Sequence, residues 1–580
     1  MGDNLPVAGQ IGRMMDRSVH AGIAQMTGGL SPISLAQAYL DWALHLAVSP
    51  GKQLALVDKA VRKGARFWEF AWRAAMPGAD TADCIDPLPQ DRRFRDPAWH
   101  GFPFNLFQQA FLLQQQWWHN ATTELPGVSP HHEAVASFCA RQILDVMSPA
   151  NFVVTNPVVL DRTVRSGGAN LAAGARHLAE DWSRLLAGRP PVGCEDWQVG
   201  RDVAVTPGKV VYRNRLIELI QYAPATAAVR PEPVLIVPAW IMKYYILDLS
   251  PENSLVRHLV AQGFTVFMVS WKNPGYEDAG LEIDDYRTQG VMAALAAIGG
   301  IVPDARIHAT GYCLGGTLLA IAAAAMARDG DDRLRSVSMF AAQTDFTEAG
   351  ELTLFIDDSE VHFLEALMSN QGYLDAKQMT GAFQLLRSND LIWSRIVRDY
   401  LMGERSEMSD LMAWNADATR MPARMHSQYL HRLFLDNDLA AGRLAVEGRP
   451  IALTDIAVPI FAVGTEHDHV APWRSTYKIH LLSDAEITFV LASGGHNVGI
   501  VAPPRPASPY HFRIAQRPPN GLFHDPDTWL ARAARRDRSW WPAWFEWLEE
   551  RSGPAVPPPV LGSSGAAAIA DAPGSYVLES

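Results

Sequence analysis

The spacing of hydrophobic residues changes near residue 200. Before it, apolar side chains recur every third or fourth position in runs covering residues 34–75, 104–118, 132–145 and 170–186. This is the period of helices with one buried face. The pattern therefore predicts an α-rich region in this part of the chain.

Beyond residue 200, short apolar runs typical of buried strands alternate with helical segments. The predicted strands cover residues 210–212, 215–222, 234–237, 265–269, 307–310, 336–340, 458–463 and 487–491, with the run at 487–491 as the last strand. The predicted helices between them cover residues 254–262, 286–298, 314–328 and 473–482. Such an alternation predicts an α/β fold, in which a mostly parallel sheet has helices on both faces.

These patterns divide the chain into four parts. Residues 1–33 have no strong period and are expected to form a flexible N-terminus, followed by the α-rich domain at 34–200. The α/β domain covers 201–552, and residues 553–580 have the Pro/Gly/Ala-rich composition of a flexible tail. A helical and irregular insertion at about 345–457 interrupts the α/β domain, and an insertion of this length is typical of a cap over an active site.

Composition excludes several classes of function. The 580 residues are 48% hydrophobic and 19% charged, as in a packed globular protein, and the net charge of −12 does not suit a nucleic-acid-binding protein. Four cysteines are too few for a disulfide framework, and no Cys/His spacing predicts a metal site. The longest apolar stretches, 291–302 and 318–327, are too short for a transmembrane span, and no secretion signal is recognisable. We therefore expect a cytoplasmic protein.

The strongest chemical signal is the hexapeptide Gly311-Tyr312-Cys313-Leu314-Gly315-Gly316, between a predicted strand and an Ala-rich helix. It resembles the nucleophile elbow G-x-S-x-G of α/β-hydrolases, with cysteine in place of serine. The elbow needs Gly311, Gly315 and Gly316 because side chains there would strike the strand or the helix. The N-terminus of the helix favours a thiolate, so Cys313 is the candidate nucleophile. The other three cysteines lack this context.

A nucleophile of this kind needs a base and an acid, which follow it along the chain in loops after later strands. Asp468 lies after the strand predicted at 458–463, and His496 follows the strand at 487–491. They are the candidate acid and base. Glu466, His467 and His469 lie in the same loop as Asp468 and are alternatives to it. Asp345, after the strand predicted at 336–340, is a further alternative.

Two backbone N–H groups would form the oxyanion hole. One is that of Leu314, directly after the nucleophile. The second should come from the loop after the strand at 234–237, and because Pro238 has no N–H, the candidates are Ala239, Trp240 and Ile241.

At these motifs the chain resembles the polyhydroxyalkanoate synthases of the long, single-subunit type. The box at 311–316, the acid motif Asp468-His469-Val470-Ala471-Pro472-Trp473 and the base motif Gly495-His496 all match that family. Further similarity lies at residues 96–99, 144–156, 166–168, 205–208, 243–249, 270–274, 414–415 and 573–577. The resemblance covers roughly residues 90–550.

The resemblance implies an α/β-hydrolase fold and an acyltransferase. Such enzymes join (R)-3-hydroxyacyl groups from coenzyme A thioesters into a polyester and release CoA, with no other cofactor. Cys313 would carry the acyl group, and His496 would deprotonate the thiol of Cys313. Asp468 would orient His496 or activate the attacking 3-hydroxyl. The family also implies a homodimer, a growing polyester chain and a granule surface as partners.

Two alternatives remain. A thioesterase or polyester depolymerase would use the same three residues with water as acceptor, although the cysteine argues against a depolymerase. An inactive granule-associated scaffold is the alternative of another class, and the complete set of catalytic residues argues against it. We expect the insertion to exclude water from the site. Its large apolar side chains are Phe355, Phe363, Leu364, Trp393, Tyr400, Trp414, Tyr429 and Phe434.

Overall fold

A computed structural model describes residues 7–27, 29–76, 82–376, 378–379, 381, 388–562 and 568–580. The chain divides into two compact units. One contains Met1–Gly29, Gly193–Met379 and Met408–Ser580, and the other contains Leu30–Val192 and Thr380–Glu407. Each unit is described separately below.

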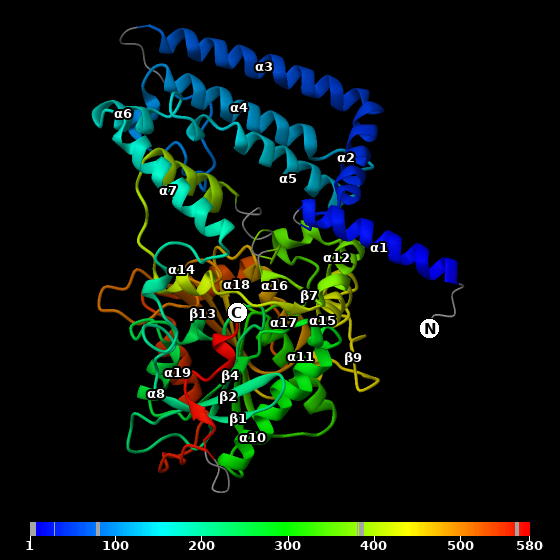
Figure 1. Ribbon diagram of the computed structural model, residues 1–580, viewed down its shortest axis with the longest axis vertical. Helices are drawn as coiled ribbons and strands as arrows, with labels where there is room; N and C mark the ends of the chain where they lie inside the picture. The colour runs from blue at the N-terminus through cyan, green and yellow to red at the C-terminus, as the bar shows by residue number, and fades with distance from the viewer. Residues whose placement is uncertain are drawn as a thin grey trace. The chain divides into compact units, whose positions relative to one another are not determined.

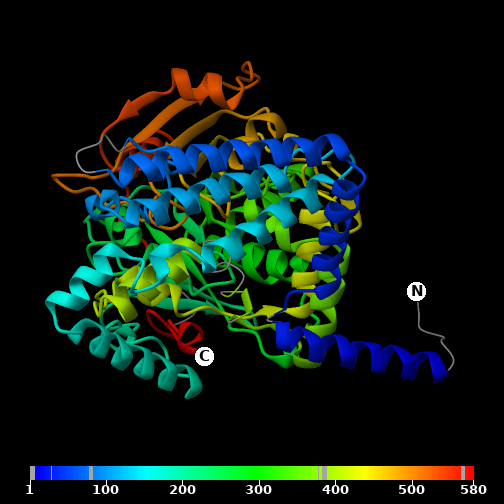
Figure 2. The same ribbon diagram turned by 90° about the horizontal axis from the view of Figure 1, so that it is seen from above.

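The second unit is helical. Its helices are α2 (Pro32–Ala47), α3 (Pro50–Ala74), α4 (Phe104–Thr122), α5 (Pro130–Val146), α6 (Pro157–Arg165) and α7 (Ala169–Leu186). Helices α3, α4 and α5 lie side by side (Figures 1 and 2). The continuous run predicted at 34–75 is two helices, because Pro50 starts α3 where its missing N–H costs nothing.

Residues 380–407 of the insertion belong to this helical unit rather than to a separate cap. The segment Ile396–Leu401 packs on α7 so closely that a Cβ added at Gly174 would lie 1.8 Å from the carbonyl oxygen of Tyr400. The side chain of Asn170 donates to the carbonyl of Leu401 over 2.7 Å. The insertion is therefore divided between the two units.

The first unit, the α/β unit, is built on an 11-stranded sheet, counted over the described residues. Along the sheet the order is β14-β13-β12-β11-β6-β5-β3-β4-β2-β1-β15. The six central strands, β12-β11-β6-β5-β3-β4, are parallel. Antiparallel strands extend the sheet on both sides, β13 and β14 beyond β12, and β2, β1 and β15 beyond β4. Their bounds are β1 (Gly208–Arg213), β2 (Ile217–Tyr222), β3 (Val234–Val237), β4 (Val266–Trp271), β5 (Ile307–Tyr312), β6 (Leu334–Phe340), β11 (Ile460–Thr465), β12 (Ile487–Ala492), β13 (Phe512–Arg517), β14 (Ala534–Arg536) and β15 (Ala570–Asp571).

Helices cover both faces of this sheet, and the side chains of each strand alternate between two hydrophobic cores. On β11, for example, Ile460 and Ala462 join the core that contains α10 (Ala293–Ile301) and α11 (Leu314–Arg328). Phe461 and Val463 join the core that contains α8 (Leu255–Ala261) and α19 (Trp541–Glu549). Figure 1 shows α8 and α19 on the opposite side of the strands from α11. This mostly parallel sheet with helices on both faces is the α/β architecture that the sequence predicts.

The remaining elements surround this core. They are α1 (Val7–Thr27), α9 (Ile283–Asp285), α12 (Asp358–Gln371), α14 (Asp410–Asn415), α15 (Ala423–Tyr429), α16 (Trp473–Tyr477), α17 (Ile479–Leu482) and α18 (Pro526–Arg532), with the short strands β7 (Tyr373–Leu374), β8 (Met421–Pro422), β9 (Ala445–Val446) and β10 (Arg449–Pro450).

Two further expectations differ from the structure. Residues 7–27, expected to be mobile, form α1, whose Ala24 packs in a small apolar cluster with Phe363 and Leu367 of α12. The strand predicted at 487–491 is not the last, because β13 pairs with β12 along its whole length. Arginine and glutamine interrupt the apolar pattern of β13, which conceals this half-buried strand.

The prediction of a flexible tail is wrong for residues 568–580. The pair Ala570–Asp571 adds β15 to the sheet beside β1. Val577 is 2% exposed within the core of the α/β unit. Composition alone suggested disorder, but these few residues find partners that are distant in sequence.

Candidate active site

Cys313 occupies a sharp turn between β5 and α11, as the hexapeptide predicts. Its φ of +52° lies in the left-handed region, which costs a non-glycine residue on the order of 1–3 kcal/mol. The turn is held by a hydrogen bond over 2.8 Å from the backbone N–H of Cys313 to the carbonyl of Phe340 on β6. Strain of this kind, kept by surrounding contacts, is typical of functional positions.

The glycines of the elbow allow this close packing. A Cβ added at Gly315 would lie 2.1 Å from the carbonyl oxygen of Val237, at the end of β3. One added at Gly311 would lie 2.3 Å from the Cα of Gly316. Residue 315 therefore lies directly against the start of the loop that contains the candidate oxyanion donors.

Asp468 and His496 meet at the carboxyl ends of the adjacent parallel strands β11 and β12. Their side chains lie 2.7 Å apart, from Nδ1 of His496 to Oδ2 of Asp468. The other carboxylate oxygen of Asp468 accepts the backbone N–H groups of Val470 and Ala471, each over 2.8 Å. These bonds orient the carboxylate toward the imidazole.

The pair is enclosed, with the side chain of Asp468 0% exposed and that of His496 10% exposed. Burial lowers the pKa of His496, but the charge of Asp468, the charge of Cys313 and hydrogen bonds with both raise it well above its usual value. Burial raises the pKa of Asp468, but the neighbouring His496 and the two backbone donors hold it below its usual value. The arrangement thus favours the protonated imidazole beside the carboxylate of Asp468.

The alternatives for the acid have other partners. Glu466 pairs with His511 over 3.1 Å. Asp345 accepts from Thr347 and lies 3.4 Å from the ammonium of Lys478. Asp468 is thus the candidate acid that contacts His496.

One contact at the site was not anticipated. The hydroxyl of Tyr312 donates to the side-chain oxygen of Asn497 over 2.6 Å, and its ring centroid lies 5.7 Å from that of His496. Both residues are direct neighbours of predicted site residues in the sequence. That adjacency was a signal, although it does not indicate which of their atoms meet.

The loop after β3 is held through its carbonyl groups. The indole N–H of Trp271 donates to the carbonyl of Pro238 over 2.9 Å. Thr419 donates its hydroxyl to the carbonyl of Trp240 over 2.7 Å and its backbone N–H to that of Ile241 over 3.2 Å. Since C=O and N–H of a trans peptide point in opposite directions, these bonds fix the directions of the loop's N–H groups.

The apolar side chains of the insertion do not form one cap core. Tyr400 belongs to the helical unit, while Phe363 and Leu364 pack with α1. Tyr429 packs against Phe434, with ring centroids 5.2 Å apart. Tyr429 and Cys313 both pack against the core that contains α11. Burial raises the pKa of Tyr429 well above its usual value, and the charge of Cys313 raises it further.

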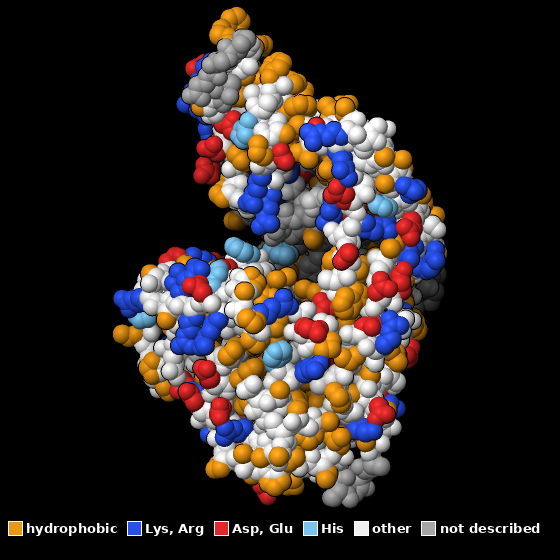
Figure 3. Space-filling view, turned by 90° about the vertical axis from the view of Figure 1, so that its left-hand side faces the viewer, with side chains coloured by type: hydrophobic (Ala, Val, Ile, Leu, Met, Phe, Trp, Pro, Cys, Tyr) orange, Lys and Arg blue, Asp and Glu red, His pale blue; other side chains and the backbone are white. Residues whose placement is uncertain are grey.

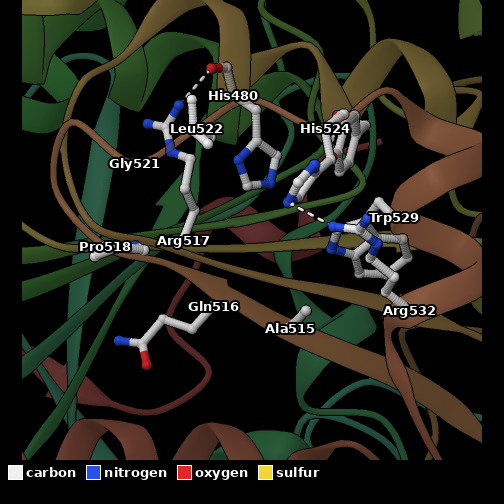
Figure 4. Close-up of a pocket in the computed structure, with 11 residues that line it drawn as sticks. His480, Ala515, Gln516, Arg517, Pro518, Gly521, Leu522, His524, Trp529 and Arg532 are labelled. Atoms are coloured by element: carbon white, nitrogen blue, oxygen red, sulfur yellow. Dashed lines mark hydrogen bonds between the residues drawn. The ribbon is translucent and has the colours of Figure 1, made fainter.

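A pocket of about 350 Å³ lies elsewhere in the α/β unit (Figure 4). It is lined by residues of α16–α18 and β13, among them His480 and Arg517. Arg517 pairs with Ile487, the first residue of β12, whereas His496 follows the last residue of that strand. The pocket is therefore at the opposite edge of the sheet and contains none of the candidate site residues.

Among the described residues, no group of His, Cys, Asp and Glu side chains is arranged to hold a metal ion. No helix in the described part of the chain is long and apolar enough to cross a membrane. The face drawn in Figure 3 mixes basic with acidic side chains.

Comparisons with known proteins give the family. Residues 90–259 match the model "Poly-beta-hydroxybutyrate polymerase (PhaC) N-terminus". Residues 10–52 match "Poly-beta-hydroxybutyrate polymerase N terminal", and residues 232–503 match "alpha/beta hydrolase fold".

Three curated relatives extend this likeness over most of the chain. The chain is 41% identical to a poly(3-hydroxyalkanoate) polymerase of Methylorubrum extorquens, over 91% of this chain and 87% of the relative. It is 38% identical to the polymerase subunit PhaC of Rhizobium meliloti, over 87% and 82% of the two chains. It is 37% identical to that of Cupriavidus necator, over 87% and 85%. The chain therefore belongs to the family of poly(3-hydroxyalkanoate) polymerases, which are acyltransferase-type enzymes on the α/β-hydrolase fold.

Proposed function

We propose that this chain polymerises (R)-3-hydroxyacyl-CoA thioesters into polyhydroxyalkanoate through acyl groups carried on Cys313. The observation that supports this most directly is the contact between Asp468 and His496 beside a strained cysteine elbow. Membership of the polymerase family supplies the substrate class. CoA is part of the substrate and a product, and no further cofactor is proposed.

In the first step, His496 takes the proton of the Cys313 thiol. Because Nδ1 of His496 bonds Asp468, Nε2 is the nitrogen left for this transfer. The thiolate attacks the thioester carbonyl, the bond to the sulfur of CoA breaks, and CoA leaves with the proton from His496. Exchange of one thioester for another is nearly balanced, so cysteine is a better carrier here than serine.

In the second step, His496 or Asp468 assists deprotonation of the 3-hydroxyl of another unit. The resulting oxygen attacks the acyl carbonyl, the bond to the sulfur of Cys313 breaks, and an oxoester forms. This step runs downhill, because an oxoester is more stable than a thioester. The enclosed carboxylate of Asp468 could serve in one of two roles. It orients His496, or it activates the attacking 3-hydroxyl.

Backbone N–H groups would stabilise the oxyanion formed in both steps. One donor is Leu314, and the other is Ala239, Trp240 or Ile241 in the loop against Gly315. Tyr429 and Phe434 would keep water from the acyl-cysteine. We further propose that the enzyme acts in the cytoplasm as a homodimer at a granule surface.

The test is an assay with 3-hydroxybutyryl-CoA that follows free thiol and chloroform-soluble polymer. Wild type should release CoA and form polymer, and Cys313→Ala should do neither. Cys139→Ala is the matched control, because this cysteine lies within α5 and outside the site. Release of CoA with only monomer acid would instead indicate a thioesterase, and no release by wild type would indicate a scaffold.

A further inference from the structure

The last described segment of the chain is anchored on β2. The buried carboxylate of Glu218 accepts the backbone N–H groups of Ser575 and Tyr576, over 2.9 and 3.0 Å. The hydroxyl of Tyr576 donates to the carbonyl of Asn214 over 2.6 Å, and Val577 is inserted into the core. These contacts fix where the next three residues lie.

Glu579 connects two loops that follow neighbouring strands. Its carboxylate accepts the backbone N–H of Asn273, after β4, over 3.0 Å. Its backbone carbonyl accepts from the ammonium of Lys243, in the loop after β3. Arg420 donates to the carbonyl of Ser580 over 3.1 Å and its backbone N–H to the side-chain oxygen of Asn273, over 3.0 Å.

Lys243 ends the loop that contains the candidate oxyanion donors. It is 3% exposed, and a buried ammonium must be paired to remain charged. Burial lowers the pKa of Lys243, and the charges of Asp417 and Glu579 oppose this shift. Its carbonyl accepts the indole N–H of Trp414 over 2.8 Å, so both ends of this residue are fixed.

The other carbonyls of the loop are bound by Trp271 and Thr419, as described above. Thr419 directly precedes Arg420, which contacts Ser580 and Asn273. The tail therefore bonds the loop directly at Lys243. It also bonds Arg420, the neighbour of Thr419, which in turn binds the loop carbonyls.

We infer that residues 576–580 are a clamp that positions the oxyanion loop through Lys243, Asn273 and Arg420. Glu579 is a positioning residue and does not touch the substrate. This inference rests on the proposed function, because it assigns the second oxyanion donor to the loop that the clamp holds. Loss of the clamp should weaken the attack on the thioester and leave the nucleophile intact.

The test compares Glu579→Ala, and a chain shortened to end at Val577, with wild type. The acylation rate is measured as the rapid release of CoA from 3-hydroxybutyryl-CoA. Alkylation of Cys313 by iodoacetamide is measured beside it, because this reaction forms no oxyanion. Asp571→Asn is the matched control, because Asp571 lies on the same tail and its carboxylate forms an exposed ion pair with Lys209 of β1.

Removal of one oxyanion donor lowers kcat by about 100- to 1,000-fold in other enzymes, and a displaced loop should cost about 10- to 100-fold. We expect this loss in kcat for the shortened chain, a smaller loss for Glu579→Ala, little change in KM and unchanged alkylation. Glu579→Gln keeps an acceptor for the N–H of Asn273 and should restore most of the rate lost in Glu579→Ala.

Acylation at the wild-type rate in the shortened chain would overturn the clamp, as would a parallel loss of acylation and alkylation. Failure of the proposed function gives a different result. In that case Cys313→Ala would still release CoA, whatever the tail variants do.

Discussion

The phenol of Tyr312 donates a hydrogen bond to the amide oxygen of Asn497 over 2.6 Å. Tyr312 directly precedes the proposed nucleophile, and Asn497 directly follows the proposed base. The bond thus ties the elbow to the loop of the imidazole, which Asp468 orients from the other side. The sulfur and the imidazole are held by two separate loops, and this contact joins the two loops.

Tyr312→Phe should slow acylation with little change in KM. A hydrogen bond of this kind contributes about 1 kcal/mol, which corresponds to a loss of about fivefold in rate. The measurement is the rate of CoA release under single-turnover conditions. Tyr510→Phe, in the chain before β13, is the control, and an equal effect of both changes would contradict a specific role for Tyr312.

Asp468→Asn should lower the pKa of His496 toward its ordinary value, because the carboxylate is one of the charges that raise it. Loss of an oriented base should cost about 100-fold or more in polymerisation. An NMR titration of labelled His496 measures the change directly. An unchanged pKa with unchanged rate would refute the role of Asp468.

The same pair should make folding stability depend on pH. A group with a raised folded-state pKa contributes stability that is fully present below its unfolded pKa, about 6.5 for histidine. That contribution is lost as pH rises through the raised pKa of His496. Thermal unfolding of wild type and Asp468→Asn between pH 6 and 9 should therefore show a steeper fall of Tm with pH in wild type. Parallel curves would contradict this assignment.

Gly315→Ala should destabilise the α/β unit by about 3 kcal/mol or more. The added methyl carbon would lie 2.1 Å from a backbone oxygen, so the strand or the helix must shift. The control is Gly300→Ala in α10, where a Cβ meets nothing within 4 Å and the change should stabilise by about 0.5–1 kcal/mol. Urea unfolding measures both, and similar values for the two would show that the elbow tolerates a side chain.

Tyr429→Ala should divert the acyl-cysteine to water. It removes a half-buried ring that packs against the same core as Cys313, so the ratio of monomer acid to polymer should rise severalfold while CoA release continues. Tyr400→Ala is the matched control, because this insertion tyrosine belongs to the helical unit. Chromatography of the acid and weighing of the polymer measure the ratio. An unchanged ratio would remove Tyr429 from the water barrier.

The parallel part of the fold was predictable because its signals are local. β3 has the predicted bounds, and the elbow, with its strand and its helix, is encoded within residues 307–328. Chain order and loop position indicated Asp468 and His496, and their side chains are in contact. In each case a short stretch of sequence determines the structure.

The missed features depend on partners far along the chain. Tyr312 and Asn497 are separated by 185 positions. The arginine-containing sequences of β13 and β14 are typical of a loop. They form strands because β13 pairs with β12 and β14 pairs with β13. The helix predicted at 286–298 begins with a π-helical turn at Tyr286–Met292, a local change of winding that the apolar period does not reveal.

The division of the insertion affects how the enzyme can be engineered. The polypeptide passes from one unit to the other four times, at residues 29–30, 192–193, 379–380 and 407–408. A chimera joined only near residue 192 would therefore combine α7 of one parent with the Ile396–Leu401 segment of another, across a fit that leaves no room for a methyl group at Gly174. Recombination between relatives has to transfer 30–192 and 380–407 together.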